Sequence, residues 1–173
     1  MFVDAISQSN DNPNDPRNRT VIHQGNDPFD GNLATPVNSS GFTRALINNL
    51  PAYRKGINPF RRGLEVGLAH GYWIIGPFVK LSPLRNTEIA NLAGLLSTIG
   101  LIIISTLAIS LYGSSNPPAP TQTITTPNPP KEFDHSEGWN DYGSGFFIGG
   151  IGGALFAYFL LANLPPIKEL LGF

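Results

Sequence analysis

Three apolar blocks, separated by polar segments, dominate the hydropathy pattern of this chain. They cover residues 63–79, 89–112 and 145–164. The second and third blocks carry no charged residue and reach the roughly 20 residues that a membrane-spanning helix needs. The first block has about 17 residues, or roughly 25 Å of helix, which is slightly short for a hydrocarbon core of about 30 Å. Basic residues flank this block, and their long side chains can reach the interface. The pattern predicts an all-α membrane protein with three transmembrane helices.

The segments between the blocks are polar and rich in residues that interrupt helices. Residues 1–62 are predicted to form an irregular N-terminal extension that contains one short amphipathic helix, Thr43–Leu50, ended by Pro51. Residues 113–144 contain six prolines and are predicted to form an extended proline-rich loop between the second and third helices. Residues 165–173 form a short C-terminal tail.

Composition supports a membrane subunit and argues against several other classes of protein. Charged residues make up 13% of the chain, about half of the roughly 25% that is usual in soluble proteins. The net charge of −1 argues against nucleic acid as a partner. The sequence has no cysteine, which excludes disulfides, iron–sulfur clusters and cysteine-bound zinc. It also lacks a nucleophile motif and a phosphate-binding glycine loop, so it does not indicate an enzyme.

The distribution of basic residues predicts the orientation of the chain in the membrane. Five basic residues flank the first block on its N-terminal side: Arg44, Arg54, Lys55, Arg61 and Arg62. Three lie on the other side, in the link and the tail: Lys80, Arg85 and Lys168. Basic residues favour the cytoplasmic face of a membrane. We therefore expect the N-terminus and the proline-rich loop on the cytoplasmic or stromal side, and the C-terminus on the opposite side.

Small residues recur at every fourth position in two of the blocks. The first block contains Gly63, Gly67 and Gly71, and the third contains Gly145, Gly149, Gly153 and Ala157. This spacing places them along one face of a helix, where either a neighbouring helix or a flat ligand can approach the backbone closely. The pattern alone leaves both interpretations open.

The first block also contains two ionisable residues, Glu65 and His70. They are five positions apart, so on a helix their side chains point about 140° apart and they belong to two different sites. A carboxylate in the bilayer interior costs roughly 3 kcal/mol or more unless it is paired or coordinated. Arg61 and Arg62 are close enough in sequence to form an ion pair with Glu65. For His70 there are two hypotheses: a hydrogen bond to a neighbouring helix, or axial ligation of a tetrapyrrole metal whose ring lies in a groove beside the glycines.

Several longer motifs are similar to a known family. They are Asn49–Arg54, Arg62–Tyr72, Gly76–Leu81, the pair Gly138-Trp139 and Gly145–Phe147. These stretches closely resemble the cyanobacterial photosystem I reaction-centre subunit XI (PsaL) family, and the similarity extends from about residue 26 to the end. The resemblance implies a three-span thylakoid subunit with a stromal N-terminus and a lumenal C-terminal tail.

The resemblance also implies ligands and partners. Members of the family bind chlorophyll a and β-carotene for excitation transfer, and their chlorophyll ligands in the first span match Glu65 and His70. Implied partners are the core subunits PsaA and PsaB, the small subunits PsaI and PsaM, the stromal subunit PsaD, lipids, and PsaL of neighbouring monomers, since the family mediates oligomerisation. The competing hypothesis is a pigment-free membrane scaffold subunit of a multi-subunit complex.

Two departures from the family pattern change these expectations. Trimer-forming relatives have a calcium site with a Pro and an Asp in the link after the first span, which correspond to Pro83 and Asn86 here. An amide in place of a carboxylate weakens calcium binding, which argues against this metal site.

Residues 114–130 are much richer in proline than in trimer-forming relatives and resemble the form associated with tetrameric photosystem I. We therefore predict a tetramer built as a dimer of dimers.

Overall fold

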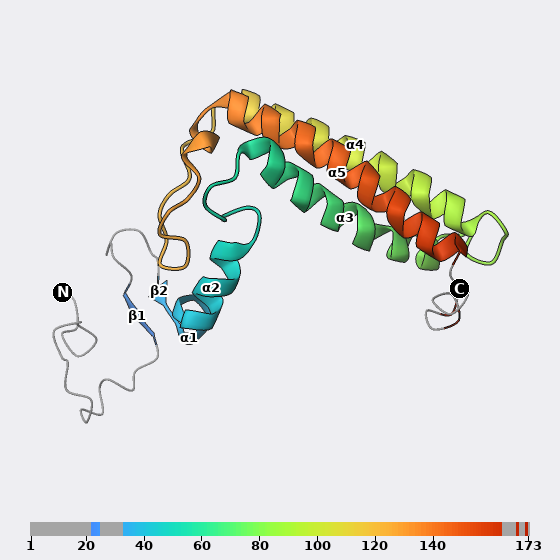
Figure 1. Ribbon diagram of the computed structural model, residues 1–173, viewed down its shortest axis with the longest axis horizontal. Helices are drawn as coiled ribbons and strands as arrows, with labels where there is room; N and C mark the ends of the chain where they lie inside the picture. Colours follow the sequence, from blue (N-terminus) through green and yellow to red (C-terminus); the bar gives the residue numbers. More distant parts are fainter. Residues whose placement is uncertain (1–21, 25–32, 164–168, 170–171, 173) are drawn as a thin grey trace. The chain divides into compact units, whose positions relative to one another are not determined.

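The computed structural model describes residues 22–24, 33–163, 169 and 172. The chain divides into two compact units. One unit comprises residues 1–55 and 120–130, and the other comprises residues 56–119 and 131–173. Figure 1 shows long helices in the second unit and short elements joined by loops in the first.

Three long helices form a bundle in the second unit (Figure 1). They are α3 (Pro59–Leu81), α4 (Ala90–Ser114) and α5 (Ser136–Asn163), and the short 3-10 helix η3 (Lys131–Asp134) precedes α5. α3 and α5 run parallel to each other, since the contacts advance in the same direction from Gly63 beside Tyr142 to Gly71 beside Gly150. α4 is antiparallel to both and is joined to α3 by the short link 82–89.

The closest packing in the bundle is between α3 and α5, along the two glycine stripes. Gly63, Gly67 and Gly71 of α3 face α5, while Gly145, Gly149 and Gly153 of α5 face α3. A Cβ atom added at any of these six positions would lie 1.9–2.2 Å from a main-chain carbonyl oxygen of the other helix. Such a separation is far below van der Waals contact, so only glycine permits this approach of the two backbones.

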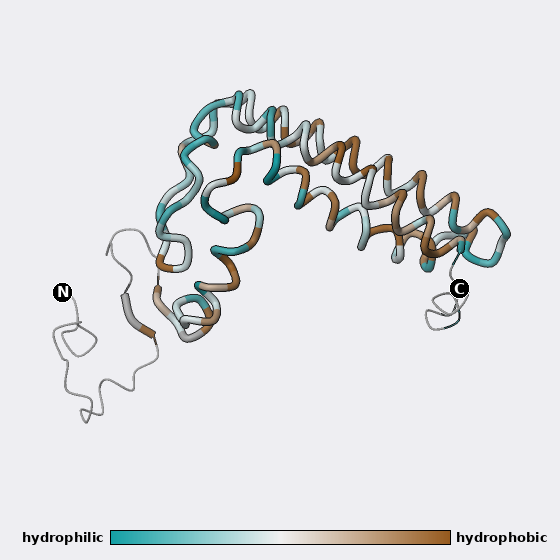
Figure 2. The backbone as a smooth tube through the Cα atoms, in the orientation of Figure 1, coloured by the Kyte–Doolittle hydropathy of each residue, from teal (hydrophilic) through white to brown (hydrophobic). Residues whose placement is uncertain are grey.

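Larger apolar side chains fill the bundle beyond the glycine stripes. Ile75 and Val79 of α3 are 2% and 1% exposed, and Ile102 of α4 is 1% exposed. Val79 packs on Gly94 near the start of α4, and Ile102 packs on Gly150 of α5. Figure 2 shows that apolar residues line the helices and that polar residues gather in the connecting loops. Each helix therefore contributes to one shared core.

α3 begins four residues before the predicted boundary at residue 63. The side chain of Asn58 accepts a hydrogen bond from the Arg61 amide at 2.8 Å, and Pro59 occupies the first helical position. An Asn cap followed by proline is a favourable helix start. The helix has 23 residues and is therefore about 35 Å long. The predicted shortness of the first block was thus wrong, because the polar first turn is helical as well.

The predicted loop 113–144 was wrong at both ends. Residues 113–114 belong to α4, and α5 begins at Ser136 rather than at residue 145. The last proline of the loop is Pro130, so nothing after it prevents helix formation. The Trp139 indole donates a hydrogen bond to the Phe133 carbonyl oxygen at 2.9 Å, which secures the first turns of α5.

Two helices of the described residues, α4 and α5, are long and apolar enough to cross a membrane. This finding supports the predicted all-α membrane protein. α3 is long enough but carries four charged side chains, those of Arg61, Arg62, Glu65 and Lys80. Length and composition alone therefore support two spans rather than three.

The other unit contains two short helices and a small strand pair. β1 (His23–Gln24) pairs antiparallel with β2 (Leu33–Ala34), and α1 (Pro36–Ser39) and α2 (Gly41–Asn49) follow. Thr35 and Asn38 form a reciprocal capping box, and the Ser40 hydroxyl accepts a hydrogen bond from the Thr43 amide. These caps start α2 two residues before the predicted Thr43–Leu50 helix. The predicted irregular segment 1–21 and most of the tail 165–173 lie outside the described residues.

Residues 120–130 of the proline-rich loop belong to the same unit as α1 and α2. The Asn48 side-chain amide donates to the Thr125 carbonyl oxygen at 2.8 Å. The Thr125 hydroxyl donates to the Asn38 carbonyl oxygen, also at 2.8 Å. Residues 116–130 contain no helix or strand, so these side-chain bonds, rather than a regular backbone ladder, fix the loop against the short helices.

The glycine contact predicts opposite effects for two substitutions in α5. Gly149→Ala should destabilise the bundle by about 1–3 kcal/mol, because the new Cβ would lie 2.0 Å from the Leu64 carbonyl oxygen. Gly152→Ala is the control, since no heavy atom lies within 4 Å of its added Cβ. It should be neutral or stabilise the helix by up to about 1 kcal/mol. Thermal denaturation of the purified variants measures both, and equal effects would contradict the packing.

Candidate functional site

The glycine stripe of α3 does not form a ligand groove. α5 covers Gly63, Gly67 and Gly71, and all three are buried. Of the two interpretations of the stripes, helix packing is therefore correct. The hypothesis that a flat ring lies on the glycines beside His70 is wrong, because the backbone of α5 occupies that space. A ligand of His70 must lie on a different part of the surface.

His70 is exposed on the side of α3, next to the contact with α5. Its Nδ1 atom lies 2.8 Å from the Val66 carbonyl oxygen, one turn earlier in the same helix. A carbonyl oxygen only accepts hydrogen bonds, so Nδ1 carries the proton. In the neutral imidazole, Nε2 then has a lone pair directed away from the helix backbone. This bond is internal to α3 and does not connect His70 to α4 or α5.

The ring of His70 is also held by an aromatic contact. The Phe146 ring of α5 lies edge-on to it, with 5.6 Å between the ring centroids. The backbone hydrogen bond and this contact restrict the imidazole from two directions. Nε2 is thus presented in a fixed orientation, and histidines that bind metals commonly donate their other ring N–H to a carbonyl oxygen in the same way.

Glu65 makes a separate polar contact on α3. Its Oε1 atom lies 3.1 Å from Nε of Arg61, one turn earlier. The Arg61 side chain is 63% exposed and that of Glu65 is 30% exposed, so the pair contributes about 0–1 kcal/mol to stability. Arg62, the other predicted partner, is 3% exposed and points into the protein. The structure thus brings Glu65 to Arg61 and gives Glu65 and His70 different neighbours.

An aromatic cluster that the sequence analysis missed lies where α4 ends and α5 begins. Its members are Tyr112, Phe133, Trp139, Tyr142 and Phe146, and neighbouring ring centroids are 4.6–6.5 Å apart. Phe146 belongs to this cluster and also contacts His70. The sequence signal was the recurrence of aromatic residues on one face of α5 at positions 139, 142 and 146. The cluster connects the His70 surface to the end of the bundle.

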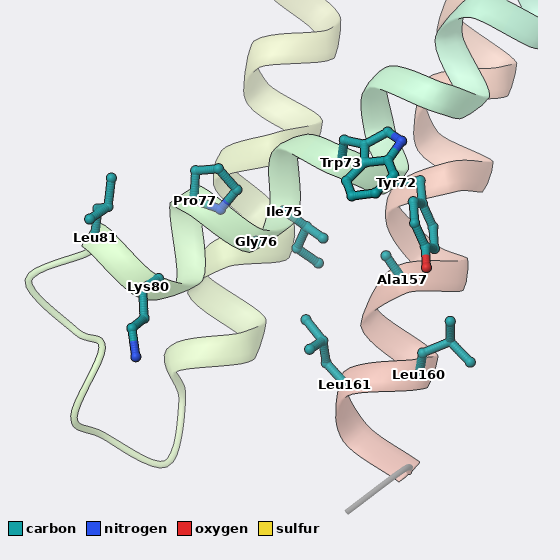
Figure 3. Close-up of a pocket in the computed structure, with 10 residues that line it drawn as sticks. All are labelled: Tyr72, Trp73, Ile75, Gly76, Pro77, Lys80, Leu81, Ala157, Leu160 and Leu161. Atoms are coloured by element: carbon teal, nitrogen blue, oxygen red, sulfur yellow. The ribbon is translucent and has the colours of Figure 1, made fainter. Parts of the chain in front are cut away.

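A groove of about 500 Å³ lies between the C-terminal halves of α3 and α5. Figure 3 shows Tyr72, Trp73 and Ile75 of α3 on one side of it and Leu160 and Leu161 of α5 on the other. Pro77 lies inside α3 beside the groove, and because proline has no N–H, the Trp73 carbonyl oxygen lacks its helical donor. The lining is mostly apolar, and among the described residues that form it Lys80 is the one with a charge. The sequence analysis did not predict this groove, which requires the pairing of α3 with α5.

The link between α3 and α4 contains the two residues of the predicted calcium site. Pro83 and Asn86 are both exposed. The Arg85 guanidinium lies 3.3 Å from the Ser82 carbonyl oxygen and so places a positive charge on the link. Within the described part of the chain, no group of three or more His, Asp or Glu side chains is suited to hold a metal ion. These features do not resemble a calcium site, which needs several negatively charged or carbonyl oxygen ligands.

The fold and these residues define a small helical membrane subunit with an outward-facing histidine and no catalytic constellation among the residues described. The family model for photosystem I reaction centre subunit XI, PsaL, matches residues 20–165. The chain belongs to this family.

Three cyanobacterial relatives, all called photosystem I reaction center subunit XI, illustrate the similarity. The protein of Mastigocladus laminosus is 60% identical over 172 residues, which cover 99% of both chains. That of Nostoc sp. strain PCC 7120 is 58% identical over 172 residues, 99% of this chain and 100% of the relative. That of Synechococcus elongatus is 55% identical over 152 residues, 87% of this chain and 91% of the relative.

Family membership establishes the general role of the protein. It is a structural subunit of photosystem I and not an enzyme. It therefore associates with other subunits of a chlorophyll-containing complex in the thylakoid membrane. The resemblance found in the sequence motifs is confirmed at this level.

The link between α3 and α4 predicts weak calcium binding. Equilibrium dialysis of the chelator-treated protein against calcium should detect no binding at this link, because Asn86 is uncharged and Arg85 is cationic. Asn86→Asp should raise the affinity by restoring a carboxylate, and Asn91→Asp, in α4, is the control. Tight binding by the unaltered protein that is lost in Asn86→Ala would contradict the prediction.

Proposed function

We propose that this protein is a pigment-carrying subunit that spans the thylakoid membrane three times and joins photosystem I monomers into tetramers. His70 and Glu65 each hold one chlorophyll a. The N-terminus lies on the stromal side and the C-terminus on the lumenal side. The observation that carries the proposal is the hydrogen bond from His70 to Val66, which leaves Nε2 as an exposed lone-pair donor.

His70 has the properties of a residue that would hold a chlorophyll through its magnesium. Ligation requires a neutral imidazole with one unprotonated nitrogen, and a hydrogen bond from the other nitrogen increases the basicity of the ligand. The bond to the Val66 carbonyl oxygen supplies this, and the Phe146 ring limits rotation of the imidazole. The bound chlorophyll supplies light absorption and excitation transfer. The protein performs no chemical step and acts by holding the pigment in a fixed place.

Glu65 is suited to the second chlorophyll because its charge is already compensated. A lone carboxylate beside an apolar ring is costly in a membrane. Arg61 lies against one carboxylate oxygen and reduces this cost. A carboxylate has about four lone-pair positions, so the ion pair and ligation of a magnesium ion are compatible. The two hypotheses for Glu65 are therefore not mutually exclusive.

The third span is α3. Its charged residues lie in its first two turns and at Lys80, near its end, so residues 66–79 are free of acidic and basic side chains apart from the titratable His70. The helix is about 35 Å long, which is enough for a hydrocarbon core of about 30 Å. Its glycine contact with α5, a helix apolar enough to cross a membrane, supports the proposal that both lie at the same depth.

The groove between α3 and α5 is proposed to hold part of a β-carotene. Its volume of about 500 Å³ falls within the roughly 300–1,000 Å³ of ordinary ligand sites. β-Carotene is a long hydrocarbon without polar groups, so it needs an apolar lining rather than hydrogen-bond donors. Tyr72, Trp73 and the leucines of α5 provide such a lining (Figure 3).

The proline-rich loop is proposed to form part of the contact between monomers. Its bonds to Asn38 and Asn48 hold it in one conformation, which reduces the entropy that a binding surface loses on association.

Within one photosystem I monomer, the proposed partners are PsaA, PsaB, PsaI, PsaM and PsaD, and lipids. A pigment-free scaffold is the alternative, and the oriented His70 favours the pigment-carrying role over it.

His70→Leu tests the pigment assignment. Photosystem I that contains this variant should lose one chlorophyll per copy of the subunit, measured by pigment extraction and by the absorbance difference spectrum. His135→Leu is the control, because His135 lies outside α5 and contacts Asp134. His70→Gln controls for misfolding. Its side-chain amide oxygen can still coordinate magnesium, so this variant should retain the pigment. Full pigment content in assembled His70→Leu complexes would refute ligation by His70.

The loop contacts predict an effect on oligomeric state. Native electrophoresis and negative-stain imaging of solubilised photosystem I should show tetramers, and Thr125→Ala should shift them toward dimers. The variant loses one hydrogen bond, worth about 0.5–1.5 kcal/mol, and releases the loop from Asn38. Thr121→Ala, at an exposed loop position, should leave the tetramer intact. Particles with threefold symmetry would contradict the predicted tetramer.

A further inference from the structure

Trp73 is a large aromatic residue on the outer surface of α3, where it is 73% exposed. It lies three residues after His70, the middle residue of the 23-residue helix, which is about 4.5 Å along the helix axis. Tryptophans of membrane proteins gather at the interfaces, where the indole N–H meets polar groups. In the proposed three-span insertion, Trp73 lies close to the middle of the hydrocarbon instead, so its position needs another explanation.

The indole N–H of Trp73 has no acceptor among the residues that the structure describes. The sequence has one other tryptophan, Trp139, and its N–H donates to the Phe133 carbonyl oxygen at 2.9 Å. Hydrocarbon offers no acceptor, so an N–H left there without a partner costs free energy. We therefore expect Trp73 to donate to a group that is bound beside α3.

Two aromatic contacts hold the Trp73 indole in place. The Tyr72 ring lies edge-on to it, with 5.5 Å between the ring centroids and 90° between the planes. Tyr72 in turn stacks on Phe156 of α5, with centroids 6.2 Å apart. In Figure 3 the indole nitrogen is at the end of the side chain that lies away from Pro77. Long side chains of a helix lean toward its N-terminus, so the N–H is directed toward the turn that contains His70.

His70 and Trp73 are neighbours on the surface of α3. Residues three apart on a helix point about 60° apart, and their Cβ atoms are about 5–6 Å apart. A chlorophyll macrocycle is wider than one helical turn of about 5.4 Å. A macrocycle held by His70 would therefore extend over the adjoining turn, and its edge would come within reach of the Trp73 side chain.

The chemistry of the two proposed pigments decides which of them can accept the hydrogen bond. β-Carotene, proposed for the groove that Trp73 also lines, has no polar atom. Chlorophyll a has a keto carbonyl at the edge of its macrocycle, and a carbonyl oxygen is an acceptor. The indole N–H is a donor only. The polar atom of the Trp73 side chain thus matches the chlorophyll of His70 and not the carotene.

We propose that Trp73 is a positioning residue for the chlorophyll held by His70, and that its indole N–H donates to the keto carbonyl of that pigment. This inference rests on the proposed ligation by His70. A single axial ligand leaves the macrocycle free to rotate about the bond between nitrogen and metal, and a second contact at the edge removes that freedom. Because the keto group is conjugated with the macrocycle, a hydrogen bond to it also lowers the energy of the excited state. Trp73 therefore sets both the orientation and the absorption wavelength of the pigment.

Trp73→Phe tests the proposal, because it removes the N–H and keeps an aromatic ring beside Tyr72. Photosystem I that contains this variant should retain its full chlorophyll content. The bands of the His70 chlorophyll are obtained by subtracting the spectrum of complexes that carry His70→Leu in addition. In Trp73→Phe, the absorption band at low temperature should shift to shorter wavelength. The keto stretching band in the resonance Raman spectrum should shift to higher frequency, since the carbonyl loses its hydrogen bond.

Trp139→Phe is the matched control. It loses the same N–H, but that group donates to Phe133 within the chain, so the bands of the His70 chlorophyll should not move. Unshifted bands in Trp73→Phe, in complexes where His70→Leu removes one chlorophyll, would overturn the role of Trp73 and leave ligation by His70 intact. A lipid ester or a carbonyl of another subunit as the acceptor would give this result. Full chlorophyll content in His70→Leu complexes would refute the ligation itself, and this inference with it.

Discussion

The contact between the backbones of α3 and α5 is the constraint on which the rest of the structure depends. Six glycines place main-chain carbonyl oxygens where side chains would otherwise be, and no other residue fits at these positions. In a membrane there is little hydrophobic force between helices, so close packing of this kind is a main source of association. The contact fixes the rotation of α3 about its axis. It thereby decides which residues of α3 are covered and which face outward.

The position of His70 follows from that rotation. It lies just beside the line of contact, where Phe146 of α5 touches its ring and its Nδ1–H donates to a carbonyl oxygen of its own helix. Glu65 points away from α5 and pairs with Arg61. The groove beside Pro77 is formed by the same two helices further along. One packing interaction therefore sets the geometry of three surface features.

The sequence predicted the features that depend on local periodicity and missed those that depend on contacts between distant segments. The apolar blocks located α4 and α5, and the fourfold spacing of glycines marked the faces of close approach but left open whether a helix or a flat ligand covers them. The start of α3 was missed although Asn58-Pro59 is a local signal, because the following Arg61 and Arg62 were assigned to the interface rather than to the helix. The start of α5 was missed because its first turns are polar and contain glycine, and they are stabilised by Trp139, Phe133 and Tyr112. The bond between Asn48 and Thr125 joins residues 77 positions apart, and no local pattern indicates it.

The parallel pairing of α3 and α5 also imposes an order on biosynthesis. α3 is made before α4, and its glycine face has no partner until α5, the last of the three helices, has been synthesised. Under the proposed three-span insertion, the first helical hairpin therefore enters the membrane with a row of bare backbone exposed to lipid. A chain that ends before α5 leaves that row open to any other helix with small residues. Quality control of this subunit is thus expected to act on the arrival of its C-terminal helix.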